Sequence, residues 1–285
     1  MRLELDGGFA LNVEQAGSGP PLVLLHGFMG SARAWGPFAE LLCARFTTLA
    51  VDIAGHGASD KPRELDHYLS AQAASDVVRA VAAFGFAQAS WLGYSMGGRL
   101  ALMIAASESA AAVDRLVVIG GSPGLAGAEA RTARVAADEA LADQIESEGV
   151  PAFVEHWESL PLFASQRHLP VGMRQAIRRG RLANEAHGLA NSLRGMGTGA
   201  QSALHARLPE MTAPALLLAG AEDTKFAAIA EEMATAMPNA RRQLVADAGH
   251  AAHIEKPAYC ARTIIAFLGE GTEGRVDGDR VAAGG

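Results

Sequence analysis

Residues 92–99 read Leu92-Gly93-Tyr94-Ser95-Met96-Gly97-Gly98-Arg99, and they are the most informative run in this chain of 285 residues. An apolar, strand-like run at 89–93 leads into them, and an apolar helical run continues to residue 106. Glycines on both sides of Ser95 remove the Cβ atoms that would clash in a tight strand-to-helix turn. Such a turn exposes the serine hydroxyl at the N-terminus of the next helix, which favours developing negative charge. The G-x-S-x-G pattern therefore predicts a nucleophilic serine and not a plain glycine-rich turn.

Short apolar runs recur along the chain and are typical of buried parallel strands. They lie at 21–25, 47–51, 89–93, 116–119 and 215–218, and a last strand is expected at 242–245. Helical patterns separate them, at 70–84, 96–106, 227–237 and 257–268. This alternation predicts an α/β fold with a mostly parallel sheet and helices on both faces.

The alternation breaks between about residues 122 and 208. Helical segments at 128–148, 151–159 and 172–184 follow one another there without a convincing strand. Together with the nucleophile motif, an insertion at this place is typical of the α/β-hydrolase fold, in which it forms a helical lid. We predict one α/β-hydrolase domain over residues 1–268, with a lid at about 122–208. The tail at 269–285 is rich in glycine and charge, and we expect it to be disordered.

Composition limits the classes of partner. A formal net charge of -7 without a basic stripe argues against nucleic acid. No apolar run is long enough to span a bilayer, and residues 1–15 alternate apolar and charged side chains where a signal peptide would have an apolar core. Cys43 and Cys260 stand in helical patterns, so a disulfide framework is not expected. These features predict a reduced cytoplasmic protein, and nothing in them demands an oligomer.

A nucleophilic serine needs a general base, and the base needs an orienting carboxylate. The chain order of this fold is serine, acid, histidine, which predicts a triad of Ser95, Asp223 and His250. His253 competes as the base, but we interpret it as a solvated loop histidine. Glu222 competes as the acid, because it stands beside Asp223 after a predicted strand.

An oxyanion hole would complete this machinery. Its predicted donors are the backbone N–H groups of Phe28, which follows the strand at 21–25, and of Met96. We interpret His26 and the loop at 52–59 as structural. The sequence contains no metal-binding pattern, phosphate loop or dinucleotide fingerprint, so no cofactor is predicted. These residues alone could serve ester, thioester, amide, C–C or halide chemistry, because a fold does not determine a function.

Between about residues 21 and 267 the chain resembles the 2-succinyl-6-hydroxy-2,4-cyclohexadiene-1-carboxylate synthase family of menaquinone biosynthesis. The nucleophile motif and Leu25-His26-Gly27-Phe28-Met29-Gly30-Ser31 are shared with many hydrolases. The more specific motifs lie in the lid, at 160–165 (LPLFAS) and 188–201 (GLANSLRGMGTGAQ). Asp223-Thr224-Lys225-Phe226 and the run at 248–253 complete the set. One departure is Ala54, which stands where the family usually has proline.

The resemblance implies a small-molecule substrate with several carboxylates, which forked guanidinium groups bind well. The positions that match binding residues of the family are Arg99, Arg134, Arg181, Tyr94 and Trp157. Arg131 and Arg178 are near competitors of the two lid arginines, for which a surface-charge role stays open. A packing role also stays open for Trp157.

The resemblance further implies that Ser95, made basic by His250 and Asp223, removes the proton α to the succinyl carbonyl. Negative charge on that oxygen would face the amides of Phe28 and Met96, and collapse of the enolate would expel pyruvate without an acyl-enzyme. The alternative is a serine hydrolase that acts on an ester or C–C bond of a carboxylated small molecule. A non-enzymatic binding pocket is disfavoured because all three triad residues are present.

Overall fold

The computed structural model describes residues 1–270. Over this range eight strands form one sheet in the order β1-β2-β4-β3-β5-β6-β7-β8. The strands are β1 Arg2–Glu4, β2 Ala10–Ala16, β3 Pro21–Leu25, β4 Thr47–Val51, β5 Ala89–Tyr94, β6 Val113–Ile119, β7 Ala215–Gly220 and β8 Ala240–Val245. Strands β3 to β8 pair in parallel, whereas β1 and β2 pair antiparallel with their neighbours. The predicted α/β fold with a mostly parallel sheet is confirmed.

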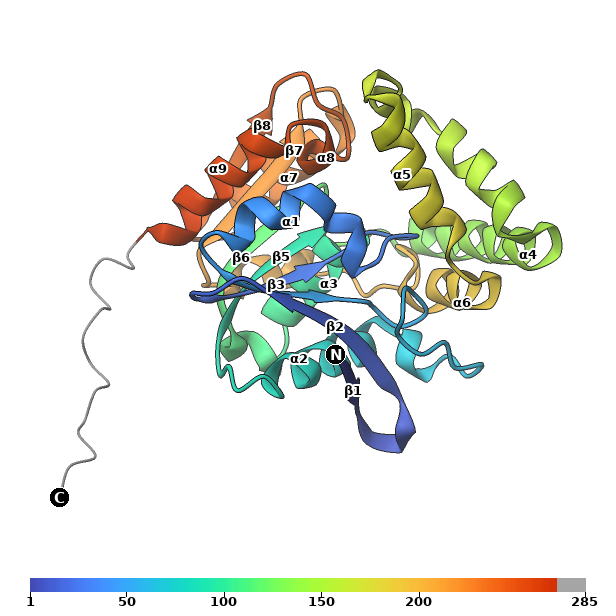
Figure 1. The fold of residues 1–285 in the computed structure, drawn as a ribbon, viewed down its shortest axis with the longest axis horizontal. Coiled ribbons are helices and arrows are strands. Elements are labelled where there is room, and N and C mark those ends of the chain that lie inside the picture. The colour runs from blue at the N-terminus through green and yellow to red at the C-terminus, as the bar shows by residue number, and fades with distance from the viewer. Residues whose placement is uncertain (271–285) are drawn as a thin grey trace.

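Helices cover both faces of the sheet (Figure 1). The helices of this part are α1 Gly36–Cys43, α2 Ser70–Ala82, α3 Met96–Ala105, α7 Thr224–Ala236, α8 Ala252–Glu255 and α9 Pro257–Gly269. Because side chains alternate along a strand, Val23 and Leu25 join the core with α2, α3 and α7. Leu22 and Leu24 point the other way and join the core with α1 and α9. Burial on both faces explains why these strands are continuous apolar runs in the sequence.

The N-terminal pair β1 and β2 was not predicted. Leu3 and Leu11 face each other in its antiparallel register, while Arg2 and Glu4 are exposed. An edge strand buries only one face, so its sequence alternates and lacks the apolar run by which the central strands were identified.

Three helices that lie between β6 and β7 in the sequence form a separate layer (Figure 1). They are α4 Ala128–Ser159, α5 Val171–Leu182 and α6 Ala186–Met196, and we call them the lid. Helix α4 combines the two helices predicted at 128–148 and 151–159, and Gly149 with φ of 82° marks the kink between them. Helix α6 packs on α4 through a small core of its own that includes Ile145, Phe153 and Leu189.

The C-terminal helix α9 ends at Gly269, one residue beyond its predicted end. The rest of the tail predicted to be disordered lies outside the described residues, except for Glu270. Among residues 1–270 the longest helices are too polar to cross a membrane.

Candidate active site

Ser95 occupies the sharp turn between β5 and α3. Its backbone has φ of 52° and ψ of −108°, a conformation that non-glycine residues rarely adopt. A Cβ at Gly93 would lie 2.2 Å from the carbonyl oxygen of Gly97, and one at Gly97 would lie 2.0 Å from that of Leu25. Both glycines are therefore required for the close approach that holds Ser95 at the end of its strand.

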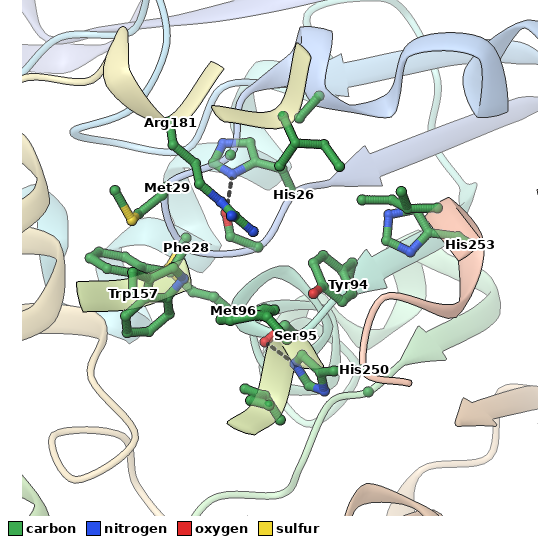
Figure 2. A pocket seen from close by; sticks show the side chains of 18 of the residues that line it. His26, Phe28, Met29, Tyr94, Ser95, Met96, Trp157, Arg181, His250 and His253 are labelled. Atoms are coloured by element: carbon green, nitrogen blue, oxygen red, sulfur yellow. Dashed lines mark hydrogen bonds between the residues drawn. The ribbon is translucent and has the colours of Figure 1, made fainter. Parts of the chain in front are cut away.

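The three residues of the predicted triad are brought together. His250 Nε2 lies 3.0 Å from Ser95 Oγ (Figure 2), and His250 Nδ1 lies 2.7 Å from Asp223 Oδ2. His250 and Asp223 are buried, and the carboxylate accepts a hydrogen bond from Nδ1–H, which leaves Nε2 to accept from the serine hydroxyl. Asp223 also caps α7, because its Oδ1 accepts from the backbone N–H of Phe226. Glu222 is exposed, so the geometry places Asp223 and not Glu222 beside the histidine.

The interpretation of His253 as a solvated loop residue was wrong. His253 is 3% exposed and lies in the short helix α8, which turns the ring into the core. Its ring centroid lies 4.6 Å from that of Tyr94 and 5.0 Å from that of Trp35. Burial, aided by the nearby His250, lowers the pKa of His253 to about 3, so the ring is neutral at physiological pH.

His26 has the structural role that the sequence indicated. Its Nε2 accepts from the backbone N–H of Ile53 at 3.0 Å, and burial lowers the pKa of the ring. The carboxylate of Asp52 accepts from the backbone N–H groups of Ala32 and Ala58. These bonds tie the loop after β4 to the segment that carries Phe28.

The oxyanion hole, with the backbone N–H groups of Phe28 and Met96 as donors, stays a prediction, and both residues lie beside the cavity. Met96 is the first residue of α3, where helix N–H groups have no acceptor within the helix and the helix dipole favours negative charge. Phe28 and Met96 both line the cavity beside Ser95 (Figure 2). These positions are compatible with the prediction that the two amides would donate to an oxygen that gains charge next to Ser95.

A cavity of about 640 Å³ opens at Ser95 between the sheet and the lid. This volume is in the range of small-molecule sites. All of the predicted binding residues line it, namely Tyr94, Arg99, Arg134, Trp157 and Arg181. The competitors Arg131 and Arg178 are not among the described residues that line it. Arg131 instead donates to the carbonyl oxygens of Leu125 and Ala126, and Arg178 pairs with Glu155 and Glu158 on the lid.

Among the described residues four arginines line the cavity, and the three that were predicted have different partners; the fourth, Arg33, pairs with Glu14 and was not predicted. Arg99 donates to two neutral acceptors, Gln201 Oε1 at 2.7 Å and the carbonyl oxygen of Met196 at 2.6 Å. Arg134 Nε donates to Asp138 Oδ1 at 2.8 Å. Burial and the charge of Arg134 lower the pKa of Arg99 to about 10, which leaves it cationic at neutral pH.

Arg181 points from the lid into the cavity (Figure 2). It donates to Glu158 Oε1 at 3.0 Å and to the amide oxygen of Gln166 at 3.3 Å. Its guanidinium carbon lies 5.1 Å from the ring centroid of Phe163, so a cation–π contact also holds it.

Aromatic rings form the rest of the wall near Ser95. Trp157 packs against Phe28 with ring centroids 5.2 Å apart and against Phe153 at 5.6 Å, and it also lines the cavity. The position of Trp157 is therefore compatible with both roles considered for it, packing and substrate binding. Burial raises the pKa of Tyr94, so its hydroxyl stays protonated where it lines the cavity.

Several residues of the site were not predicted. Lys225 and Gln166 line the cavity, and Asp138 and Gln201 hold two of its arginines. Asp138 follows Arg134 by four residues, a helical spacing that could have indicated the pair. Within the described part of the chain, no group of three or more His, Cys, Asp or Glu side chains is placed to hold a metal ion.

Residues 20–257 match the family model described as alpha/beta hydrolase fold. The 2-succinyl-6-hydroxy-2,4-cyclohexadiene-1-carboxylate synthase of Salmonella newport (strain SL254) is 35% identical over 255 residues, which cover 87% of this chain and 94% of that protein. A Bacillus subtilis (strain 168) protein that carries the same name as a provisional assignment is 38% identical over 260 residues, 91% of this chain and 94% of its own.

Solved structures agree with these relatives. The structure of MenH from S. aureus superposes with a TM-score of 0.86 at 32% identity and covers 90% of this chain and 97% of that one. The enol-lactonase from Burkholderia xenovorans LB400 has a TM-score of 0.79 at 24% identity, covering 92% of this chain and 97% of that one. At that identity the likeness to the enol-lactonase concerns the fold alone.

Proposed function

We propose that this chain, which belongs to the α/β-hydrolase fold family and within it to the 2-succinyl-6-hydroxy-2,4-cyclohexadiene-1-carboxylate synthase family, is a pyruvate-eliminating lyase. Its substrate would be 2-succinyl-5-enolpyruvyl-6-hydroxy-3-cyclohexene-1-carboxylate and its product 2-succinyl-6-hydroxy-2,4-cyclohexadiene-1-carboxylate. The observation that carries the proposal is one cavity that joins Ser95 and His250 to the guanidinium groups of Arg99, Arg134 and Arg181. A substrate with carboxylates on its succinyl, ring and enolpyruvyl parts matches these positive charges.

In this mechanism Ser95 acts as a base and not as a nucleophile. His250 takes the hydroxyl proton of Ser95 across the 3.0 Å contact, and Asp223 stabilises the imidazolium that forms. Ser95 Oγ then removes the proton α to the succinyl carbonyl, and the electron pair of the C–H bond moves to the carbonyl oxygen. The catalytic roles of the three residues are part of the proposal.

The enolate oxygen would lie against the amides of Phe28 and Met96. Fixed donors at such an oxygen typically contribute about 3 to 4 kcal/mol each to lowering the barrier. When the enolate collapses, a ring C=C bond forms and the C–O bond to the enolpyruvyl group breaks. The leaving enolate regains a proton and is released as pyruvate, so no water and no acyl-enzyme take part.

The arginines would bind and orient the substrate. A hydrogen bond to a charged group contributes about 1.5 to 3 kcal/mol, which corresponds to roughly 10- to 100-fold in affinity for each arginine. Because Arg99 lies one helical turn after Ser95 and Arg181 comes from the lid, the carboxylates would be held from both sides of the reacting carbon. By orienting the substrate, these contacts would make elimination in the site faster than spontaneous elimination in solution.

Two further expectations belong to the proposal. Residues 1–268 would act as one domain in which the segment at about 122–208 serves as the lid. The protein would work in the cytoplasm, in keeping with free cysteines at positions 43 and 260. Burial raises the pKa of Cys260 to about 12, which makes its thiol unreactive.

The test is release of pyruvate from the proposed substrate, measured against spontaneous elimination. We expect fast release by the unmodified chain and a loss of about 10³-fold or more in Ser95→Ala, with an unchanged melting temperature. No release above background from a folded sample would overturn the lyase. The search would then turn to hydrolysis of carboxylated esters and diketones, the alternative that keeps the triad.

A further inference from the structure

The loop after α6 lies on α4 and carries the side chain that bonds to Arg99. We call residues 197–201 the positioning loop, and it contains Gly197, Gly199 and Gln201. A Cβ at Gly199 would lie 2.6 Å from the backbone nitrogen of Val135, and one at Gly197 would lie 2.4 Å from Asp138 Oδ2. Both glycines therefore allow the loop to lie directly on α4, at the level of Arg134 and Asp138.

Asp138 lies beneath Arg134, behind the cavity wall. It is 2% exposed, and its Oδ1 accepts from Arg134 Nε while its Oδ2 has no hydrogen-bond partner. A carboxylate at such a depth is costly unless it is paired, so the pair constrains both side chains. Because Asp138 engages the Nε edge, the terminal nitrogens of Arg134 are left for an acceptor in the cavity.

Gln201 holds Arg99 in a different way. It is 1% exposed, and its Oε1 accepts from Arg99 Nη1 while the carbonyl oxygen of Met196 accepts from Nη2. Both acceptors are neutral, so they determine where the guanidinium lies without cancelling its charge. The lowered pKa of Arg99 agrees with a cation that has no anion bound to it directly.

We infer that Gln201 and Asp138 are positioning residues of this active site, which hold Arg99 and Arg134 toward the carboxylates of the substrate. Gln201 does so with a neutral carbonyl, and this leaves the full charge of Arg99 for a substrate carboxylate. The substrate in this inference is that of the proposed function. Conversely, Asp138 supplies an acceptor whose negative charge is not itself needed for substrate binding.

The decisive comparison is between Gln201→Leu and Gln201→Glu. Leucine removes the acceptor, and we expect KM to rise about 10-fold or more with kcat changed less. Glutamate keeps the volume and the Oε1 acceptor, so the melting temperature should not fall. KM should nevertheless rise about as much as in Gln201→Leu, because the new carboxylate neutralises Arg99. A purely structural role for Gln201 would make the glutamate variant harmless.

Asp138 is tested by one variant that removes only its charge and by another that also removes its hydrogen-bond acceptor. Asp138→Asn keeps an oxygen for Arg134 Nε and removes the charge, so KM should stay within about 2-fold of the unmodified value or fall. Asp138→Leu removes the acceptor, and KM should rise about 10-fold. An equal rise of KM in the asparagine and leucine variants would contradict the role assigned to Asp138.

Matched controls come from the outer face of α4. Gln144 bonds to Glu148, and Asp143 pairs with Arg194 with its side chain 68% exposed. Neither residue lines the cavity among the described residues. We therefore expect Gln144→Leu, Gln144→Glu and Asp143→Asn to change KM by less than about 2-fold.

A binding measurement separates this inference from the proposed function. The probe is benzoate with an ortho-succinyl group, a stable dicarboxylate that cannot eliminate pyruvate, and its Kd is measured by calorimetry. If the unmodified chain binds the probe but releases no pyruvate, only the lyase is refuted. The Kd values of the variants for the probe would then still test the positioning roles. The inference is overturned if Gln201→Glu binds the probe as tightly as the unmodified chain. It is also overturned if the unmodified chain does not bind the probe at all.

Discussion

The triad lies at one cavity together with Arg99, Arg134 and Arg181, which we call the arginine wall, but different features of the chain place the two groups. Ser95 directly follows strand β5 and Asp223 lies three residues after strand β7, so the backbone of the sheet places them. The arginines lie on α3 and on two lid helices. Side chains distant in sequence hold Arg99 and Arg181, whereas Arg134 is held by Asp138 on its own helix. Arg99 and Gln201, for example, are separated by 102 residues. The triad is thus a product of strand ends, whereas the positions of the three arginines depend on individual side-chain contacts, most of them between elements.

The supports of the two regions also differ in strength. Helix α3 beside the triad is mostly buried, but α5, which carries Arg181, has no buried residue. Contacts of α5 include ion pairs of Arg178 and Arg181 with Glu158 and a hydrogen bond from Asn184, just after the helix, to the carbonyl oxygen of Met29. Partly exposed ion pairs contribute only about 0 to 1 kcal/mol each. The lid side of the cavity should therefore tolerate substitutions that lower affinity without loss of the fold.

The largest effect should come from the acid of the triad. Asp223→Asn should lower kcat by about 10³-fold or more, because an amide no longer orients the His250 ring or stabilises its charge. The asparagine oxygen still accepts from the N–H of Phe226, so α7 keeps its cap. Steady-state kinetics and a thermal melt measure both quantities. Glu222→Gln is the control and should stay within about 2-fold; equal losses in the two variants would mean that the acid is misassigned.

An intermediate effect should come from the lid. Arg181 and Arg178 both pair with Glu158, but of the two only Arg181 lines the cavity. Arg181→Met should raise KM by about 10- to 100-fold, the contribution of one charge-assisted contact. Arg178→Met loses a similar ion pair and should change KM by less than about 2-fold. Similar KM values for the two variants would contradict the assignment of Arg181 to the cavity and of Arg178 to the surface.

The smallest effect concerns the stability of the fold at acidic pH, and it involves residues in the region of the triad and not the arginine wall. Burial lowers the pKa of His253 and of His56 to about 3, against about 6.5 in an unfolded chain. Below pH 6.5 the unfolded chain binds protons that the folded chain does not. The stabilisation is therefore complete above pH 6.5 and is lost as pH falls toward 3, by about 1.4 kcal/mol per pH unit for each histidine.

Replacing one of these histidines should make that dependence shallower. In His253→Phe the free energy of unfolding should fall with decreasing pH about 1.4 kcal/mol per unit less steeply between pH 5.5 and 4. Urea titrations at a series of pH values measure the slope independently of the absolute stability of the variant. A slope equal to that of the unmodified chain would show that His253 takes up its proton in the folded state as well.

Most of the sheet and the three residues of the triad could be predicted from the sequence. Doubly buried strands appear as apolar runs, and the nucleophile turn requires glycine at 93 and 97 wherever it occurs. The β1–β2 edge was missed because only one of its faces is buried. His253 was misplaced because a loop histidine and one that a short helix turns inward have the same local sequence.

Local chemistry in the chain was enough to establish the α/β fold, the helical insertion and the order Ser95, Asp223, His250. These features arise from strand ends and tight turns, whose requirements involve only neighbouring residues. The choice of Arg134 over Arg131 and of Arg181 over Arg178 belongs to the tertiary structure. Residues three apart on a helix lie on nearly the same face, so periodicity cannot separate them. Only the packing of the lid on the sheet decides which of each pair reaches the cavity.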